Sequence, residues 1–181
     1  MILLFLAKIT CLAQIYPLTT TDDVPSNAYI KDINNNLPAY AGTWKGSWNG
    51  KTFIINLKKI KYYNTLLEEN SYYQDLLVGK FQVKDFESKI LFDNMSISDN
   101  ESKIKGGRMF PDGKYLLTYV DPDLCFKSGI ISIEFTDSTK KMLNWKFDES
   151  ENMIDTDCFY WGKPASERPE PLPEEIILTK Q

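Results

Sequence analysis

The chain has 181 residues, of which 43% are hydrophobic, 13% aromatic and 25% charged, and this composition fits one globular domain with a full core. Its net charge of −4 leaves no broad basic surface, so we expect no nucleic-acid partner. The chain contains no histidine, which excludes Ser-His-Asp and Cys-His catalysis and histidine-ligated zinc.

Residues 1–13 read MILLFLAKITCLA, an apolar run that ends on small residues and is followed by a polar one. This pattern predicts a signal peptide that is cleaved after Ala13, and the alternative is a buried first strand. Lipid modification of Cys11 stays open. No other segment approaches the length of a membrane-spanning helix, so we expect no transmembrane segment.

Residues 14–37 are polar and are interrupted by Pro17 and Pro25, which predicts an N-terminal tether. Residues 38–181 are expected to form a single β domain. Its clearest signal is Asn49-Gly50 between two alternating segments, because this dipeptide favours the two positive φ angles of a two-residue hairpin turn. A second hairpin is predicted at Pro111-Asp112-Gly113.

Further strands are expected at residues 74–83, 89–97, 129–135, 142–147, 158–161 and 175–180, while residues 62–73 stay unassigned. This gives nine or ten short strands without a long amphipathic helix. Such spacing predicts an all-β fold, an antiparallel meander that forms a lipocalin-like barrel and pairs its first and last strands. An open β-sandwich is the alternative.

Cleavage after Ala13 would leave two cysteines, Cys125 and Cys158. An even pair in an exported chain predicts one disulfide, and the alternative is two buried thiols.

Three segments resemble a known family: Tyr40-x-Gly42-Thr43-Trp44, Leu76-Leu77-Val78-Gly79-Lys80, and Leu172-Pro173 before Ile177-Leu178-Thr179-Lys180. The chain resembles small secreted proteins of Bacteroidota that are grouped as a domain of unknown function. The resemblance implies a bacterial, exported setting and supplies no known site residue. Gly42-Thr43-Trp44 is also similar to the Gly-x-Trp that opens lipocalin barrels.

Four aromatic residues are the predicted ligand-binding residues: Trp44, Trp48, Tyr119 and Trp145. Aromatic side chains at a barrel mouth offer large contact area and polar tips, which suits an apolar or glycan ligand. The alternative is that they fill the core of the barrel.

Charged residues give weaker signals. An acidic loop is interpreted as a solvated hairpin loop without a metal, because its spacing matches no EF-hand; it contains Asp148, Glu149, Glu151, Asp155 and Asp157. Lys105-Gly106-Gly107-Arg108 lacks the Walker spacing and is interpreted as a loop with incidental charge. We therefore expect no catalytic set, no metal site and no cofactor.

The leading hypothesis is a non-enzymatic binding or interaction protein of the cell envelope, located in the periplasm, on the outer-membrane surface or outside the cell. Its partner would be a small apolar or glycan ligand or a surface protein. The alternatives are a hydrolase that uses a pair of carboxylates and a structural surface protein.

Overall fold

The computed structural model describes residues 14–65, 70–151, 154 and 156–181. The predicted signal peptide, residues 1–13, lies outside this part of the chain. The elements, in chain order, are β1 (Ile15–Pro17), β2 (Tyr29–Lys31), α1 (Leu37–Tyr40), β3 (Gly42–Trp48), β4 (Lys51–Asn64), β5 (Tyr72–Lys84), β6 (Ile90–Asp93), β7 (Ile104–Met109), β8 (Tyr115–Asp121), the 3-10 helix η2 (Pro122–Leu124), β9 (Lys127–Phe135), β10 (Met142–Glu149), the 3-10 helix η3 (Ala165–Glu167) and β11 (Glu175–Lys180). None of the helices in these ranges is long and apolar enough to cross a membrane.

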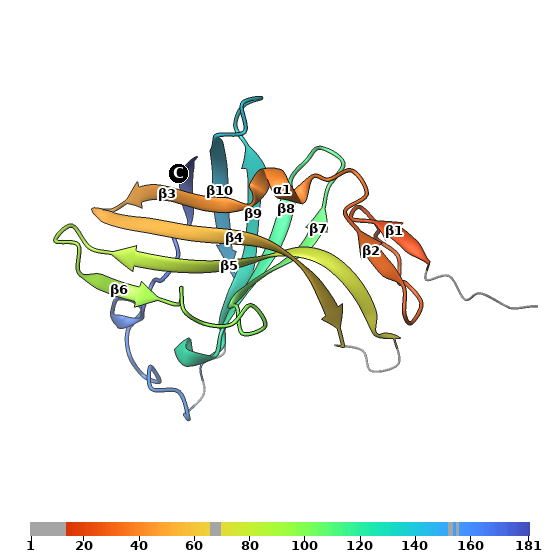
Figure 1. Ribbon diagram of the computed structural model, residues 1–181. Coiled ribbons are helices and arrows are strands. Elements are labelled where there is room, and N and C mark those ends of the chain that lie inside the picture. The colour runs from red at the N-terminus through yellow and green to blue at the C-terminus, as the bar shows by residue number, and fades with distance from the viewer. Residues whose placement is uncertain (1–13, 66–69, 152–153, 155) are drawn as a thin grey trace, which may run out of the picture.

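Eight of the strands form a closed antiparallel barrel (Figure 1). Each of β3, β4, β5, β7, β8, β9, β10 and β11 pairs with the next in this order, and β11 pairs back with β3. The predicted meander and its closure through the first and last barrel strands are therefore confirmed, and the fold is not an open sandwich. β1, β2 and β6 are additional strands outside the barrel.

Both predicted hairpins are present. Asn49 and Gly50 have φ angles of 47° and 73° and join β3 to β4 through the pair Trp48 and Lys51. These positive angles give the turn a twist that matches its flanking strands. The second turn joins β7 to β8, with Gly113 at φ 93°.

The interior of the barrel is filled by aromatic and branched side chains. The largest completely buried side chains include Trp44, Trp145, Tyr115, Tyr119 and Phe53. The Phe53 and Trp145 ring centroids lie 5.2 Å apart. Burial of each such side chain contributes about 2–3 kcal/mol relative to its exposure, so this cluster dominates the stability of the barrel.

The structure differs from two sequence-based expectations. Residues 14–37 contribute β1 and β2 instead of a free tether, because β2 pairs in parallel with β5 and apolar side chains such as Leu18 and Val24 are buried. Residues 158–161 form turns, so the strand predicted there was wrong. Cys158 in that segment is held by a disulfide, and Gly162 follows with φ 72°, which directs the chain into a turn.

The predicted disulfide is confirmed. Cys125 and Cys158 are bonded, and their Cα atoms lie 5.7 Å apart. The bond joins the loop after η2 to the segment that leads from β10 to β11. It therefore anchors a long connection with little regular structure to the end of β8.

One edge of β5 has three different partners along its length. Its first residues pair with β2, Val78 and Gly79 pair with β7, and its last residues pair with β6. The β4–β5 hairpin extends beyond the barrel and curls away from it, next to β1 and β2 (Figure 1). The sheet consequently forms a concave region outside the barrel where β5 and β7 separate.

Candidate functional site

A groove of about 1030 Å³ occupies this concave region, and we call it the outer groove. It is lined by the extended β4–β5 hairpin, by the N-terminal segment before β2, by β7 and β8, and by the loop between β6 and β7. Its size is at the upper end of the range for small-molecule sites in proteins. The barrel interior is filled, so this external groove is the candidate functional site.

The floor of the outer groove comes from alternate residues of β4 and β5. Tyr62 and Asn64 on β4 stand opposite Gln74 and Tyr72 on β5, so all four lie on one face of the hairpin. The Asn64 amide donates to the Tyr72 hydroxyl at 3.1 Å. This face presents two tyrosine rings beside neutral amide groups.

β5 and β7 separate because their pairing is short. Only Val78 and Gly79 on β5 pair with β7. Beyond these pairs the Gln74 side-chain amide donates to the Gly107 carbonyl at 2.6 Å, replacing a backbone ladder with a side-chain bridge. The buried side chains of Leu18 and Leu76 also line the groove.

A bulge in β7 directs two basic side chains to the groove. The β7–β8 register shifts between Gly106 and Met109. Strict alternation from the buried Ile104 would point Arg108 into the core, whereas here Met109 is buried and both Lys105 and Arg108 line the groove. Lys105-Gly106-Gly107-Arg108 is therefore part of a strand, and its interpretation as a loop was wrong.

A glycine is required at the start of this bulge. A Cβ atom at Gly106 would collide with the Tyr115 hydroxyl and would lie 2.9 Å from the Leu77 amide nitrogen. In the structure the Leu77 N–H donates to the Tyr115 hydroxyl at 3.3 Å. The consecutive glycines were a sequence signal for a bulge, since glycine inside a strand often marks one.

The cations of the outer groove differ in their partners. Lys103 contacts the carboxylates of Asp121 and Asp123 at 2.6 and 2.7 Å. Burial lowers the pKa of Lys103, but these two hydrogen bonds outweigh burial and raise the pKa above its ordinary value. Lys105 and Arg108 are half-buried and have no carboxylate within 4.0 Å among the described residues.

A pair of buried carboxylates lies at the junction of the N-terminal segment and the β4–β5 hairpin. Lys59 Nζ contacts Asp32 Oδ2 at 3.1 Å and Asp75 Oδ2 at 3.4 Å. Asp32 also accepts from the backbone N–H groups of Asn36 and Leu37. We call these three charged residues the Asp32–Lys59–Asp75 cluster.

The hydrogen bonds around Asp75 favour its ionised form. Asp75 accepts from the Tyr29 hydroxyl at 2.6 Å and from the Asp32 backbone at 3.1 Å. Burial alone would raise the pKa of Asp75, but these bonds and Lys59 hold it below its usual range. Burial and the neighbouring Asp75 raise the pKa of Tyr29 to about 12. Such a cluster fixes structure and is poorly suited to donate a catalytic proton.

The four predicted ligand-binding aromatic residues lie apart from the outer groove. Trp44, Tyr119 and Trp145 are 0% exposed, and Trp48 is half-buried against the core. The indole of Trp44 donates to the Tyr40 carbonyl at 2.8 Å, so its polar group is satisfied within the protein. This packing fits the core role that the sequence left as the alternative, and a ligand contact by these residues stays a prediction.

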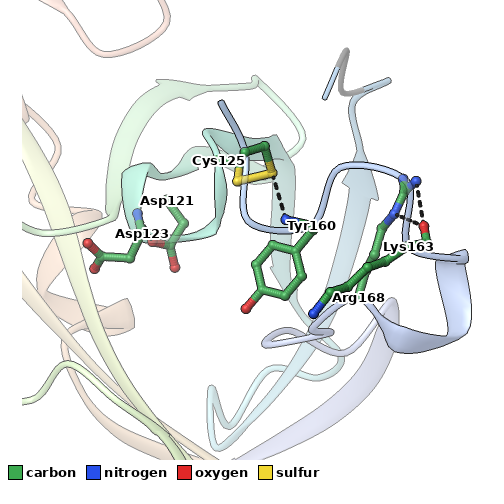
Figure 2. Close-up of a disulfide and its surroundings, with 7 residues drawn as sticks. Asp121, Asp123, Cys125, Tyr160, Lys163 and Arg168 are labelled. Atoms are coloured by element: carbon green, nitrogen blue, oxygen red, sulfur yellow. Dashed lines mark hydrogen bonds between the residues drawn. A yellow bond between two sulfur atoms is a disulfide. The ribbon is translucent and has the colours of Figure 1, made fainter. Parts of the chain in front are cut away.

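The disulfide region forms a second, smaller pocket of about 300 Å³, which Tyr160 and Arg168 line (Figure 2). Arg168 donates from two nitrogens to the Lys163 carbonyl at 3.1 and 3.2 Å, and the Tyr160 amide donates to Cys158 Sγ. In the neighbouring acidic loop, Glu149 pairs with Lys127 on β9. Asp155 of that loop lies outside the described residues.

Comparison with known proteins gives one match. No curated protein and no solved structure matches the chain. A model described as a family of unknown function (DUF6705) matches residues 1–181, which agrees with the uncharacterised domain expected from the sequence. The chain therefore belongs to the family of unknown function DUF6705.

Proposed function

We propose that this protein is an exported, non-enzymatic binding protein whose outer groove holds an oligosaccharide. The observation that carries the proposal is the composition of the groove floor, where the rings of Tyr62 and Tyr72 alternate with the amides of Asn64 and Gln74. A sugar offers apolar ring faces and a dense set of hydroxyl groups. Tyrosine rings can stack on the apolar ring faces, and amide groups can both donate hydrogen bonds to the hydroxyl groups and accept them.

The walls of the outer groove also carry side chains that suit a sugar. Threonine and asparagine residues from three other segments line the groove, among them Thr20, Asn100 and Thr118. Aliphatic residues line the groove as well, among them Leu18, Leu76 and Val120, and they add apolar surface that the ring faces of a sugar can contact. The groove volume of about 1030 Å³ accommodates several sugar rings.

Binding without hydrolysis is supported by the state of the nearby carboxylates. Glycoside hydrolysis needs a carboxylic acid with a raised pKa and a second carboxylate across the cleft. Asp123, which lines the groove, is paired with Lys103. Asp75 has a lowered pKa, and Asp32 is held by Lys59 and two backbone N–H groups.

An exported location is supported by two observations. Residues 1–13 have the pattern of a signal peptide, and the Cys125–Cys158 disulfide is the kind of bond that persists in an oxidising compartment. The periplasm, the outer-membrane surface and the extracellular space all meet this condition.

The test is calorimetric titration of the folded protein with a panel of tetrasaccharides, in the wild type and in Tyr72→Ala. We expect saturable binding to at least one tetrasaccharide, weakened up to about tenfold in the variant, because stacking on one ring contributes about 0.5–1.5 kcal/mol. Tyr63→Ala is the matched control, since Tyr63 lies on the opposite face of the same hairpin and is 44% exposed.

Two outcomes would contradict this site. The first is the absence of saturable binding to every tetrasaccharide. The second is binding that Trp48→Ala abolishes while Tyr72→Ala leaves it intact, which would move the ligand to the barrel mouth predicted from sequence.

A further inference from the structure

We infer that the outer groove selects an oligosaccharide that carries carboxylate groups, and that Lys105 and Arg108 bind this charge. The inference rests on the proposed function, because it specifies the ligand class of the same groove. It starts from the two basic side chains that the β7 bulge directs to one face.

Both cations are half-buried, and in the described part of the chain neither has a carboxylate within 4.0 Å. Lys105 Nζ lies 5.1 Å from the centre of the Tyr62 ring, and the Arg108 guanidinium carbon lies 4.8 Å from the centre of the Phe110 ring. Arg108 Nε is buried and has no hydrogen-bond acceptor among the described residues. A partly buried cation without a counterion is costly, and a bound anion would relieve that cost.

Neighbouring Lys103 provides an internal comparison. It lies on the same wall but is already neutralised by Asp121 and Asp123 at 2.6 and 2.7 Å. Among the residues that the structure describes, carboxylates thus pair with Lys103 and with neither Lys105 nor Arg108. The Arg108 guanidinium can bind a carboxylate through two parallel hydrogen bonds. The Lys105 ammonium adds positive charge and does not require one fixed hydrogen-bond geometry.

The acidic residues of the groove do not occupy this position. Asp22 and Asp23 are exposed residues on the N-terminal segment, and neither lies within 4.0 Å of a basic group among the described residues. Glu101 accepts hydrogen bonds from the backbone and hydroxyl of Ser98. The Lys105–Arg108 wall therefore carries the unneutralised positive charge, and Tyr62, which Lys105 overlies, places a ring for the sugar next to it.

The experiment compares a charged probe with a neutral probe that has the same sugar rings and hydroxyl groups. They are a galacturonate tetrasaccharide and its fully methyl-esterified form, which keeps the rings and hydroxyl groups and loses the carboxylate charge. Calorimetric titration of the wild type should show at least tenfold tighter binding of the acid than of the ester. This preference should fall when the salt concentration is raised from 50 to 500 mM, because salt screens charge pairs near the surface.

The variants are Lys105→Gln, Arg108→Gln and their combination. Each single change should weaken binding of the acid more than binding of the ester, and in the combined variant the acid and the ester should bind with equal affinity. Lys51→Gln is the matched control, since Lys51 Nζ also lies over an aromatic ring, that of Trp48 at 5.3 Å, but does not line the groove. Circular dichroism and urea unfolding establish that each variant is folded.

The outcomes separate this inference from the proposed function. Equal binding of acid and ester by the wild type would overturn charge selection and leave the oligosaccharide site standing. An acid preference that survives the double substitution would also overturn the assignment to Lys105 and Arg108. If neither these probes nor any member of the tetrasaccharide panel binds, the proposed function itself fails, and the inference fails with it.

Discussion

Asp75→Asn should destabilise the protein strongly although it changes a single atom. Asp75 is 5% exposed, accepts two hydrogen bonds from Tyr29 and the Asp32 backbone, and faces Lys59. An asparagine amide can accept from the Tyr29 hydroxyl, but its NH₂ group would then meet the Asp32 N–H, donor against donor. The substitution also removes one of the two carboxylate charges that contact Lys59.

The expected loss is about 3 kcal/mol. Removing one partner of a buried ion pair costs roughly 3–5 kcal/mol, and leaving a buried donor unsatisfied costs roughly 1–3 kcal/mol. The lower part of this range applies because Lys59 is 28% exposed and keeps Asp32 as a partner. With a urea m-value of about 2 kcal/mol/M, the unfolding midpoint should fall by about 1.5 M.

Urea unfolding followed by far-ultraviolet circular dichroism measures this shift. Asp148→Asn is the matched control, because Asp148 forms an exposed ion pair with Lys146 and its loss should leave the midpoint unchanged. Equal midpoints for the two variants would refute the view that the Asp32–Lys59–Asp75 cluster holds the N-terminal segment on the barrel.

The lowered pKa of Asp75 predicts how the stability of the protein depends on pH. The folded pKa of Asp75 lies below its ordinary value of 3.8, so its contribution is present above that value and is lost as the pH falls through the folded pKa. The wild type should therefore lose more stability than Asp75→Asn between pH 5 and pH 2. Parallel loss in both proteins would contradict this assignment.

Three further predictions concern other parts of the barrel. Reduction of the Cys125–Cys158 bond, which spans 33 positions of sequence, should lower the free energy of unfolding by about 3–4 kcal/mol, as measured by urea unfolding with and without dithiothreitol. Gly106→Ala should lower the thermal midpoint by several degrees because its new methyl group meets a tyrosine hydroxyl, whereas Gly107→Ala, with its nearest neighbour at 3.8 Å, should leave it unchanged. Burial and the adjacent Asp121 raise the pKa of Tyr119, so the free energy of unfolding should fall as the pH rises above about 10. In Tyr119→Phe this fall should be less steep. Equal slopes of the free energy of unfolding against pH for the two proteins, between pH 9 and 11, would contradict this.

The architecture was predictable because its signals are local. Asn49-Gly50 fixes a hairpin through the φ angles that these residues tolerate, and the alternation of Ile131 and Ile133 with polar neighbours places β9 in the wall of a barrel. Two cysteines in a chain that reads as exported were sufficient to predict the disulfide. Each of these inferences needs only a few neighbouring residues.

The outer groove was not predictable, because it depends on where distant strands separate. Nothing near Gln74 indicates that its amide will reach Gly107, 33 residues later. The bulge that directs Arg108 outward was visible only as two glycines in a row. Residues 14–37 were predicted to be a tether because most of them are polar. A few of them, such as Leu18 and Asp32, are nevertheless buried against the rest of the protein.

The closure of the barrel sets when this domain can finish folding. β3 and β11 are joined by only two residue pairs, Lys45 with Thr179 and Trp44 with Lys180. The cylinder stays open along its length until β11, which comes after all the other barrel strands in the chain, pairs with both β3 and β10. Until that moment the edges of β3 and β10 are unpaired and can join strands of other chains, so folding depends on a late, long-range contact.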